Sequence, residues 1–86
     1  MRMFYVYIIK SVSDGELYIG STKDLKRRLK AHNDGEVFST APRRPFELRY
    51  YEAYSNEDDA RNREASVKKD GRALAVLKKR INKSLQ

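Results

Sequence analysis

Three stretches of the chain combine aromatic and β-branched residues in the manner of β-strands. They cover residues 3–10, 16–20 and 46–54. Asp14-Gly15, between the first two stretches, is a signal for a hairpin turn. The pattern therefore predicts three short strands, of which the first two form a hairpin.

The segment after the second strand carries the signals of a helix. Ser21-Thr22-Lys23-Asp24 matches a capping box, with Ser21 as the N-cap and an acid three residues later. Leu25 and Leu29 lie four residues apart, so they share the buried stripe of the helix that follows. Gly35, in the sequence Asn-Asp-Gly, can end this helix in the left-handed conformation.

Two further helices are predicted after the third strand. Ser55-Asn56 opens the first of them, and the acids of its first turn suit the helix dipole. Asp70-Gly71 interrupts the pattern, and a final helix over residues 72–83 buries Leu74, Leu77 and Ile81. The order ββαβαα predicts an α/β (α+β) fold, a three-stranded antiparallel sheet flanked by about three helices, in a single domain over residues 1–86.

Charge adds a preference for one kind of partner. The chain holds 19 Lys and Arg against 12 Asp and Glu, a net charge of +7. Residues 60–86 alone hold nine basic residues and two acids. Such asymmetry favours a polyanion, most often nucleic acid. A solvated helical face that only aids solubility explains the same charge, and both interpretations stay open at this point.

The residue types also exclude several kinds of site. The chain has no cysteine, which excludes disulfides and thiolate metal sites, and its single histidine excludes a site built from several histidines. No apolar run approaches the ~18–20 residues of a membrane-spanning helix, and the start lacks a signal-peptide pattern. We therefore expect a cytoplasmic protein with no membrane partner, associated with the nucleoid when it is bound to DNA.

A set of polar side chains on these elements could carry chemistry. Tyr5 and Tyr7 share one face of the first strand, and Tyr18 could share that face across the hairpin. Gly20 ends the second strand and allows a close approach to its backbone.

The helices contribute three more residues of this kind. Arg28 lies ten residues after Tyr18, and His32 lies four residues after Arg28, so both project from one helix face. Glu64 lies in the middle of the second predicted helix, in basic surroundings.

In its order and spacing, this set resembles the GIY-YIG nuclease family. Tyr5-Val6-Tyr7 stands where the family has Gly-Ile-Tyr, and Tyr18-Ile19-Gly20 matches its Tyr-Ile-Gly element. Arg28 and His32 follow at the family's intervals, and Glu64 matches its metal-binding glutamate. The chain is similar to small stand-alone bacterial members over residues 3–82, although Tyr5 replaces the first glycine. The late asparagine of the family has only Asn82 as a nearby candidate.

The resemblance implies hydrolysis of DNA phosphodiester bonds with one divalent ion, Mg²⁺ or Mn²⁺, held by Glu64. Tyr7 would act as the base or orient the water, supported by Tyr18 and His32, while Arg28 would bind phosphate oxygens. A phenol of pKa about 10 is a poor base, so we expect nearby positive charge to lower it. Nucleic-acid contacts are expected from Lys23, Arg27, Lys78, Lys79 and Arg80.

Structural explanations exist for the same residues one by one. Tyr7 and Tyr18 could be core residues, Arg28 one of several solvated charges, and His32 a cap at the end of a helix. Glu64 could pair with Lys68 four residues later, a contact worth only ~0.3–0.5 kcal/mol. Their joint occurrence at the family spacing favours the functional interpretation.

Three functions compete at the level of sequence. The favoured one is a metal-dependent DNA endonuclease, structure-directed or weakly sequence-specific, working in DNA repair, DNA processing or a mobile element. A nucleic-acid-binding module of the same fold with weak or no catalysis is the second. An unrelated small basic protein is the third. A partner protein or a homodimer is open in each case.

Overall fold

The computed structural model describes residues 2–86, and its elements follow the predicted order. The strands are β1 (Phe4–Ser11), β2 (Leu17–Thr22) and β3 (Phe46–Tyr54). The α-helices are α1 (Leu25–Asn33), α2 (Glu57–Lys69) and α3 (Gly71–Arg80), and a short 3-10 turn, η1 (Ala41–Arg43), precedes β3. All strands are antiparallel in the order β2-β1-β3, which confirms the predicted fold class.

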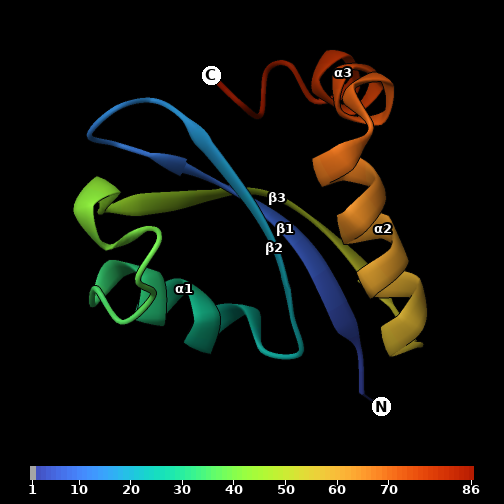
Figure 1. The fold of residues 1–86 in the computed structure, drawn as a ribbon, viewed down its shortest axis with the longest axis horizontal. Helices are drawn as coiled ribbons and strands as arrows, with labels where there is room; N and C mark the ends of the chain where they lie inside the picture. The colour runs from blue at the N-terminus through green and yellow to red at the C-terminus, as the bar shows by residue number, and fades with distance from the viewer. Residues whose placement is uncertain (1) are drawn as a thin grey trace.

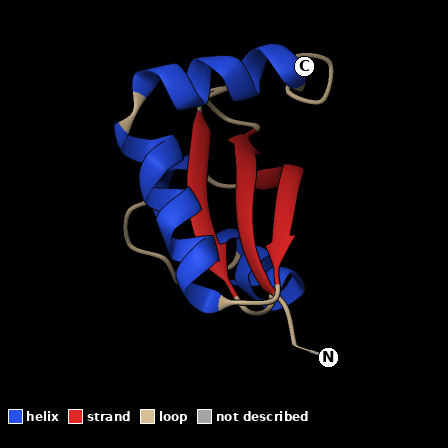
Figure 2. Ribbon diagram, turned by 90° about the vertical axis from the view of Figure 1, so that its right-hand side faces the viewer, coloured by secondary structure: helices blue, strands red, loops and turns tan. Residues whose placement is uncertain are grey.

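The sheet separates two apolar layers. One face packs Val6, Ile8 and Ile19 against α2 and α3, and the other packs Tyr7 and Ile9 under α1. Figure 1 shows α1 on one side of the sheet and α2 with α3 on the other, and Figure 2 shows α3 across one end of the strands. Because β1 is central and covered on both faces, four consecutive residues from Val6 to Ile9 are buried. The face that holds Tyr7 is therefore the face of α1.

The helix ends confirm most of the predicted caps and correct one. Gly35, just past the end of α1, has φ +79°, as expected for a left-handed position. The prediction of Ser21 as N-cap is wrong, because the Asp24 side chain accepts from the Arg27 amide at 3.1 Å instead. Pairing of β2 with β1 continues to Thr22, which keeps Ser21 within the strand. The last helix ends at Arg80, three residues earlier than predicted.

A half-buried carboxylate fastens α2 to β3. Glu52 accepts two hydrogen bonds from Arg63, at 2.9 and 3.0 Å, and one each from the hydroxyls of Tyr50 and Tyr54. Burial alone would raise the pKa of Glu52, but these donors outweigh it and lower the pKa. Arg63 directly precedes Glu64, so this contact helps to fix where the Glu64 carboxylate lies.

Within residues 2–86, no helix has the length and apolar character needed to cross a bilayer.

Replacing Glu52 tests this anchor. Glu52→Gln keeps the shape but removes the charge that four donors share, so we expect the free energy of unfolding to fall by about 1–3 kcal/mol. Glu47→Gln in the same strand is the matched control, because its ion pair with Arg49 is exposed and should contribute below about 1 kcal/mol. Urea denaturation at pH 7 measures both, and equal losses would remove Glu52 as an anchor.

Candidate active site

A buried hydrogen-bond chain joins β1, α1 and the loop before η1. The Tyr7 hydroxyl lies 2.8 Å from His32 Nε2, and His32 Nδ1 lies 2.7 Å from Thr40 Oγ1. His32 and Thr40 are both fully buried, and Tyr7 is only 2% exposed. The imidazole is therefore held at both nitrogens, away from solvent.

The chain of donors assigns the tautomer of His32. Thr40 Oγ1 lies 3.4 Å from the Val37 carbonyl, which can only accept, so the Thr40 hydroxyl proton points there. Nδ1–H of His32 then donates to Thr40, and Nε2 is left to accept the proton of the Tyr7 hydroxyl. Tyr7 is thus a donor to His32, and the lone pairs of its oxygen can accept from the neighbouring Arg28 guanidinium.

Burial makes this pair neutral at rest. Burial, followed by the charge of Arg28, lowers the pKa of His32 to about 4. This result is inconsistent with His32 as a cationic cap of the helix end. The pKa of Tyr7 is raised by burial, which outweighs the lowering effect of Arg28. Arg28 lowers the pKa of the phenol, as expected of nearby positive charge, but desolvation is the larger effect and the net shift is upward.

Gly20 is the residue that makes room for the Tyr7 ring. Tyr7 and Gly20 are partners in the β1–β2 ladder, and the ring lies across the backbone of Gly20. A Cβ atom at position 20 would stand 2.4 Å from the Tyr7 hydroxyl oxygen and 2.6 Å from Cζ. The close approach predicted for Gly20 is confirmed, and the group that approaches is a side chain of the neighbouring strand.

Tyr18 and Arg28 complete the cluster around His32. The Tyr18 ring packs edge-on against the imidazole at 5.1 Å between centroids. The Arg28 guanidinium lies against both phenols, and this contact with Tyr7 raises the pKa of Arg28. Arg28 Nε is buried without a hydrogen-bond partner among residues 2–86. Arg28 therefore keeps one donor without a partner among the described residues, inside the buried part of the cluster.

Glu64 reaches the edge of this cluster from α2. Its carboxylate accepts from Ser21 Oγ at 2.6 Å and pairs with Lys68 Nζ at 2.8 Å. Lys68 also lies over the Tyr18 ring, 5.6 Å from its centroid. Burial raises the pKa of Glu64, but Lys68 and Ser21 outweigh it, so the pKa is lowered and the carboxylate is ionised. The ion pair with Lys68, offered above as a structural explanation, is present.

The donors around Glu64 decide which kind of ion could bind there. No cluster of three or more His, Asp or Glu side chains suited to a metal occurs within the described part of the chain. One ionised carboxylate, with a hydroxyl beside it, fits a hard cation that keeps most of its water, as Mg²⁺ does. Each carboxylate oxygen also retains one lone pair beyond its present hydrogen bond.

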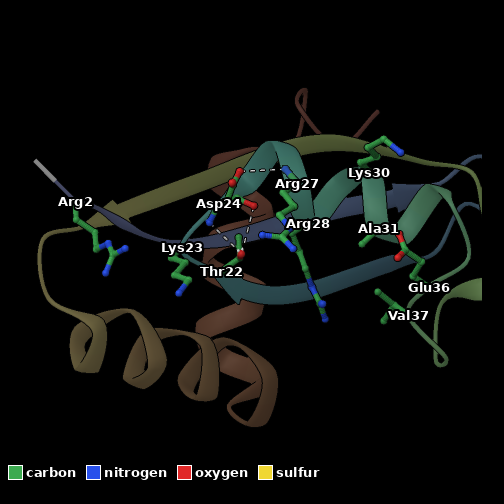
Figure 3. A pocket seen from close by; sticks show the side chains of 10 residues that line it. All are labelled: Arg2, Thr22, Lys23, Asp24, Arg27, Arg28, Lys30, Ala31, Glu36 and Val37. Carbon is green, nitrogen blue, oxygen red and sulfur yellow. Dashed lines mark hydrogen bonds between the residues drawn. The ribbon is translucent and has the colours of Figure 1, made fainter.

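The five predicted nucleic-acid residues fall into two separate groups. Lys23 and Arg27 line a hollow of about 670 Å³ together with Arg28 (Figure 3). Lys78, Lys79 and Arg80 lie in the last turn of α3, at the end of the sheet away from α1 (Figures 1 and 2). Only the first group adjoins the cluster around Tyr7.

Two members of the site were not predicted from the sequence. Thr40 lies in a loop, and only the folding of residues 34–40 back onto α1 brings it to His32. Ser21 was assigned to a helix cap, although its hydroxyl binds Glu64. Of the two residues that bind the Glu64 carboxylate, only Lys68 could be predicted from its spacing, since it lies four residues after Glu64 on the same helix.

Comparison with known proteins identifies the family to which the chain belongs. Residues 3–82 match the family described as GIY-YIG catalytic domain, and the chain belongs to this family. It is 44% identical over 68 residues to UPF0213 protein CPE1444 of Clostridium perfringens, covering 78% of this chain and 72% of that one. It is 39% identical over 69 residues to UPF0213 protein SSP2268 of Staphylococcus saprophyticus, covering 79% and 83%.

A solved structure shares the fold at clear sequence similarity. The solution NMR structure of the UPF0213 protein BH0048 from Bacillus halodurans is 35% identical and has a TM-score of 0.54. The similarity covers 87% of this chain and 81% of that one. An unrelated small basic protein, the third of the competing functions, is excluded by these results.

Adding a methyl group at Gly20 should disrupt the Tyr7 contact. Gly20→Ala forces the buried ring to move, so we expect a loss of about 1–3 kcal/mol in unfolding free energy and a broken Tyr7–His32 bond. Gly71→Ala at the start of α3 is the control, because its Cβ would meet nothing within 4 Å. Denaturant titration and the imidazole NMR shifts measure the two effects. A Gly20→Ala variant as stable as wild type would contradict this account of the glycine.

The single histidine allows a direct test of the buried pair. We expect one imidazole signal that titrates near pH 4, well below the ordinary pKa of about 6.5. Between these values the unfolded chain binds the proton and the folded protein does not, so stability falls as pH falls from about 6.5 to 4. The loss attributable to His32 is on the order of 3 kcal/mol.

A second variant isolates this contribution from the acids. Glu52 and Glu64 also have lowered pKa values, so their contributions to the stability of the fold are also lost in acid. We would therefore follow the difference in unfolding free energy between wild type and His32→Gln against pH. The contributions of the two glutamates are the same in both proteins and cancel in this difference. Titration of His32 near pH 6.5 would show that the imidazole is solvated and not buried.

Proposed function

We propose that this protein is a divalent-metal-dependent endonuclease that hydrolyses phosphodiester bonds in DNA. The observation that carries the proposal is the Tyr7 hydroxyl bonded to a neutral His32 and bordered by Arg28. This arrangement offers a donor–acceptor pair for a proton and a cation for a phosphate in one place. Membership of the GIY-YIG family supports the same reaction class.

Tyr7 is the phenol best placed to act on water. Its proton already points to Nε2 of His32, which is neutral at pH 7 and would receive it once added positive charge lowers the pKa of the phenol. The phenol oxygen can then take a proton from an attacking water or hold that water in line. Tyr18 contacts His32 only through its ring, so its role is to support the imidazole.

Arg28 would bind the phosphate group under attack. It lines the open hollow and also contacts Tyr7, so it links the surface to the buried phenol. A guanidinium can present two donors to two phosphate oxygens, which fixes orientation as well as charge. Access to Tyr7, which is almost completely buried, then leads past Arg28.

Glu64 would hold the metal ion, Mg²⁺ or Mn²⁺. Such an ion, when bound, stabilises negative charge on the phosphate and on the departing oxygen. Glu64 supplies one carboxylate, so affinity without nucleic acid should be weak. Lys68 competes for the same carboxylate at 2.8 Å, which weakens it further.

The ion pair of Lys68 with Glu64 is also the observation that favours a second function. The Glu64 carboxylate is already bound by the Lys68 ammonium group and the Ser21 hydroxyl, as in an ion pair that only stabilises the fold. The protein would then be a module that binds nucleic acid through its basic residues with weak or no cleavage. The two functions differ in whether Tyr7 and Glu64 are needed for any measurable property beyond stability.

Cleavage of supercoiled plasmid and branched DNA, with Mg²⁺ or Mn²⁺ and with chelator, tests the first function. We expect metal-dependent nicking that falls at least 10²-fold in Tyr7→Phe, because the phenol that handles the proton is lost. Glu64→Gln should abolish nicking while DNA binding persists or tightens, since one negative charge is removed. Arg28→Lys should be damaging although it keeps the charge, because the planar fork is lost.

Each variant has a matched control. Tyr5→Phe removes a phenol from the same strand face, Glu57→Gln removes a carboxylate from the same helix, and Arg72→Lys alters an arginine of α3 that does not line the hollow. All three should nick like wild type. Retained nicking by Tyr7→Phe would move the base role to another group, with Tyr18 next. Binding without nicking by wild type would support the second function.

A further inference from the structure

The loop between α1 and η1 exposes a phenylalanine almost completely. Phe38 is 96% exposed, more than any other large apolar side chain among residues 2–86. Single exposed apolar side chains are ordinary on protein surfaces, so exposure alone carries no inference. The hydrogen bonds that hold this loop and the charged residues beside it add to the exposure.

The loop that carries Phe38 is fastened on both sides of it. The Val37 carbonyl accepts from the amides of Thr40 and Ala41 at 3.1 and 2.9 Å, which closes a turn around residues 38 and 39. Before it, the Glu36 amide donates to the Ala31 carbonyl of α1 at 3.0 Å. Thr40 is fully buried against His32. The ring of Phe38 is therefore presented by an anchored turn that also positions the buried histidine.

Phe38 adjoins the basic hollow described above. Figure 3 shows Arg2 at one end of the hollow and Glu36 with Val37 at the other. Phe38 follows Val37 directly, so the turn that carries Phe38 borders this second end. Arg28 lines the hollow between the two ends and contacts Tyr7. A strand that places a phosphate on Arg28 and follows the hollow would therefore run toward this turn.

The charges in the hollow fit a nucleic-acid backbone. Four of its cations form no ion pair with any of residues 2–86: Arg2, Lys23, Arg27 and Arg28. Of its two acids, Asp24 is engaged as the N-cap of α1. A groove of unpaired cations with an exposed aromatic residue in the turn that borders it is a combination suited to single-stranded nucleic acid.

We propose that Phe38 is a nucleobase-stacking residue, so that the preferred DNA carries unpaired bases next to the bond that is cut. Bases in an intact duplex are stacked on each other and cannot reach a single exposed ring, whereas those of a single strand or branch point can. This inference rests on the proposed function and adds the substrate class to it.

A tryptophan at position 38 reports stacking directly. The chain contains no tryptophan, so Phe38→Trp introduces a single indole whose fluorescence a stacked base quenches. Titration in chelator, which prevents cleavage, should quench it with a single-stranded oligonucleotide and much less with a closed hairpin duplex. Val12→Trp is the matched control, because Val12 is 59% exposed between β1 and β2, outside both basic groups, and should not be quenched.

Removing the ring should weaken binding selectively. Phe38→Ser should lose about 5- to 150-fold in affinity for the single strand, and Phe38→Tyr should retain it. The salt dependence should stay as in wild type, because no phosphate contact is removed. Lys23→Gln should instead reduce the salt slope by roughly 1. Exposure of Phe38 means that these variants should fold.

The outcomes separate this inference from the proposed function. Single-strand binding that is unaffected by Phe38→Ser, or an unquenched indole in a protein that binds the strand, would overturn the stacking role alone. Self-association in sedimentation that Phe38→Ser abolishes, with unchanged DNA affinity, would assign the ring to contacts between copies. Failure of the wild-type protein and of every variant to bind DNA would reject the endonuclease proposal as well.

Discussion

The contact between the Tyr7 ring and the backbone of Gly20 is the constraint on which the candidate site depends. β1 is the central strand, so a large side chain on its α1 face has to share space with the neighbouring β2. A residue without a Cβ leaves that space open, and the phenol passes across it to His32. The partnership of Tyr7 and Gly20 in the ladder therefore fixes the direction of the hydroxyl before α1 packs over it. The same packing sets the chemistry, because it removes water from both the phenol and the imidazole.

Electrostatics in the resting protein oppose proton transfer within this pair. The pKa of Tyr7 is raised above its ordinary value of about 10, and that of His32 is lowered to about 4. The phenol is protonated and the imidazole neutral, so the hydrogen bond between them is poised but uncharged. Added positive charge near the phenol would reduce this difference. Arg28 supplies part of that charge, but desolvation still outweighs it. Under the proposed function, a weakly held metal ion would supply the further positive charge that proton transfer from the phenol requires.

The sequence predicted the elements better than the contacts between them. Aromatic and β-branched runs mark the strands, and Gly35 and Asp70 mark helix ends, because each of these signals acts within a few residues. Ser21 shows where local reasoning fails. Its sequence matches a capping box, but Ser21 pairs with β1 as part of β2, so the helix begins later, with Asp24 as its N-cap. Thr40 could not be predicted, since it meets His32 only after residues 34–40 fold back onto α1. Tyr7, His32 and Arg28 were found because their spacing resembles a family, and the structure shows the contacts behind that spacing.

The positive charge of the chain is divided between two places, and the size of the molecule limits how both can be used. One group borders Arg28, and the other lies on α3 at the opposite end of the sheet. The longest dimension of the protein is 30 Å. At 3.4 Å per base pair, a duplex as long as the protein has about nine base pairs, close to one helical turn. Under the proposed function, the α3 group would lie away from the nucleotides beside the reacting phosphate. It would hold a more distant part of the same DNA, which would raise affinity without constraining sequence. The holding of DNA would then be separate from its positioning at Tyr7, and only the positioning would depend on the geometry of the buried cluster.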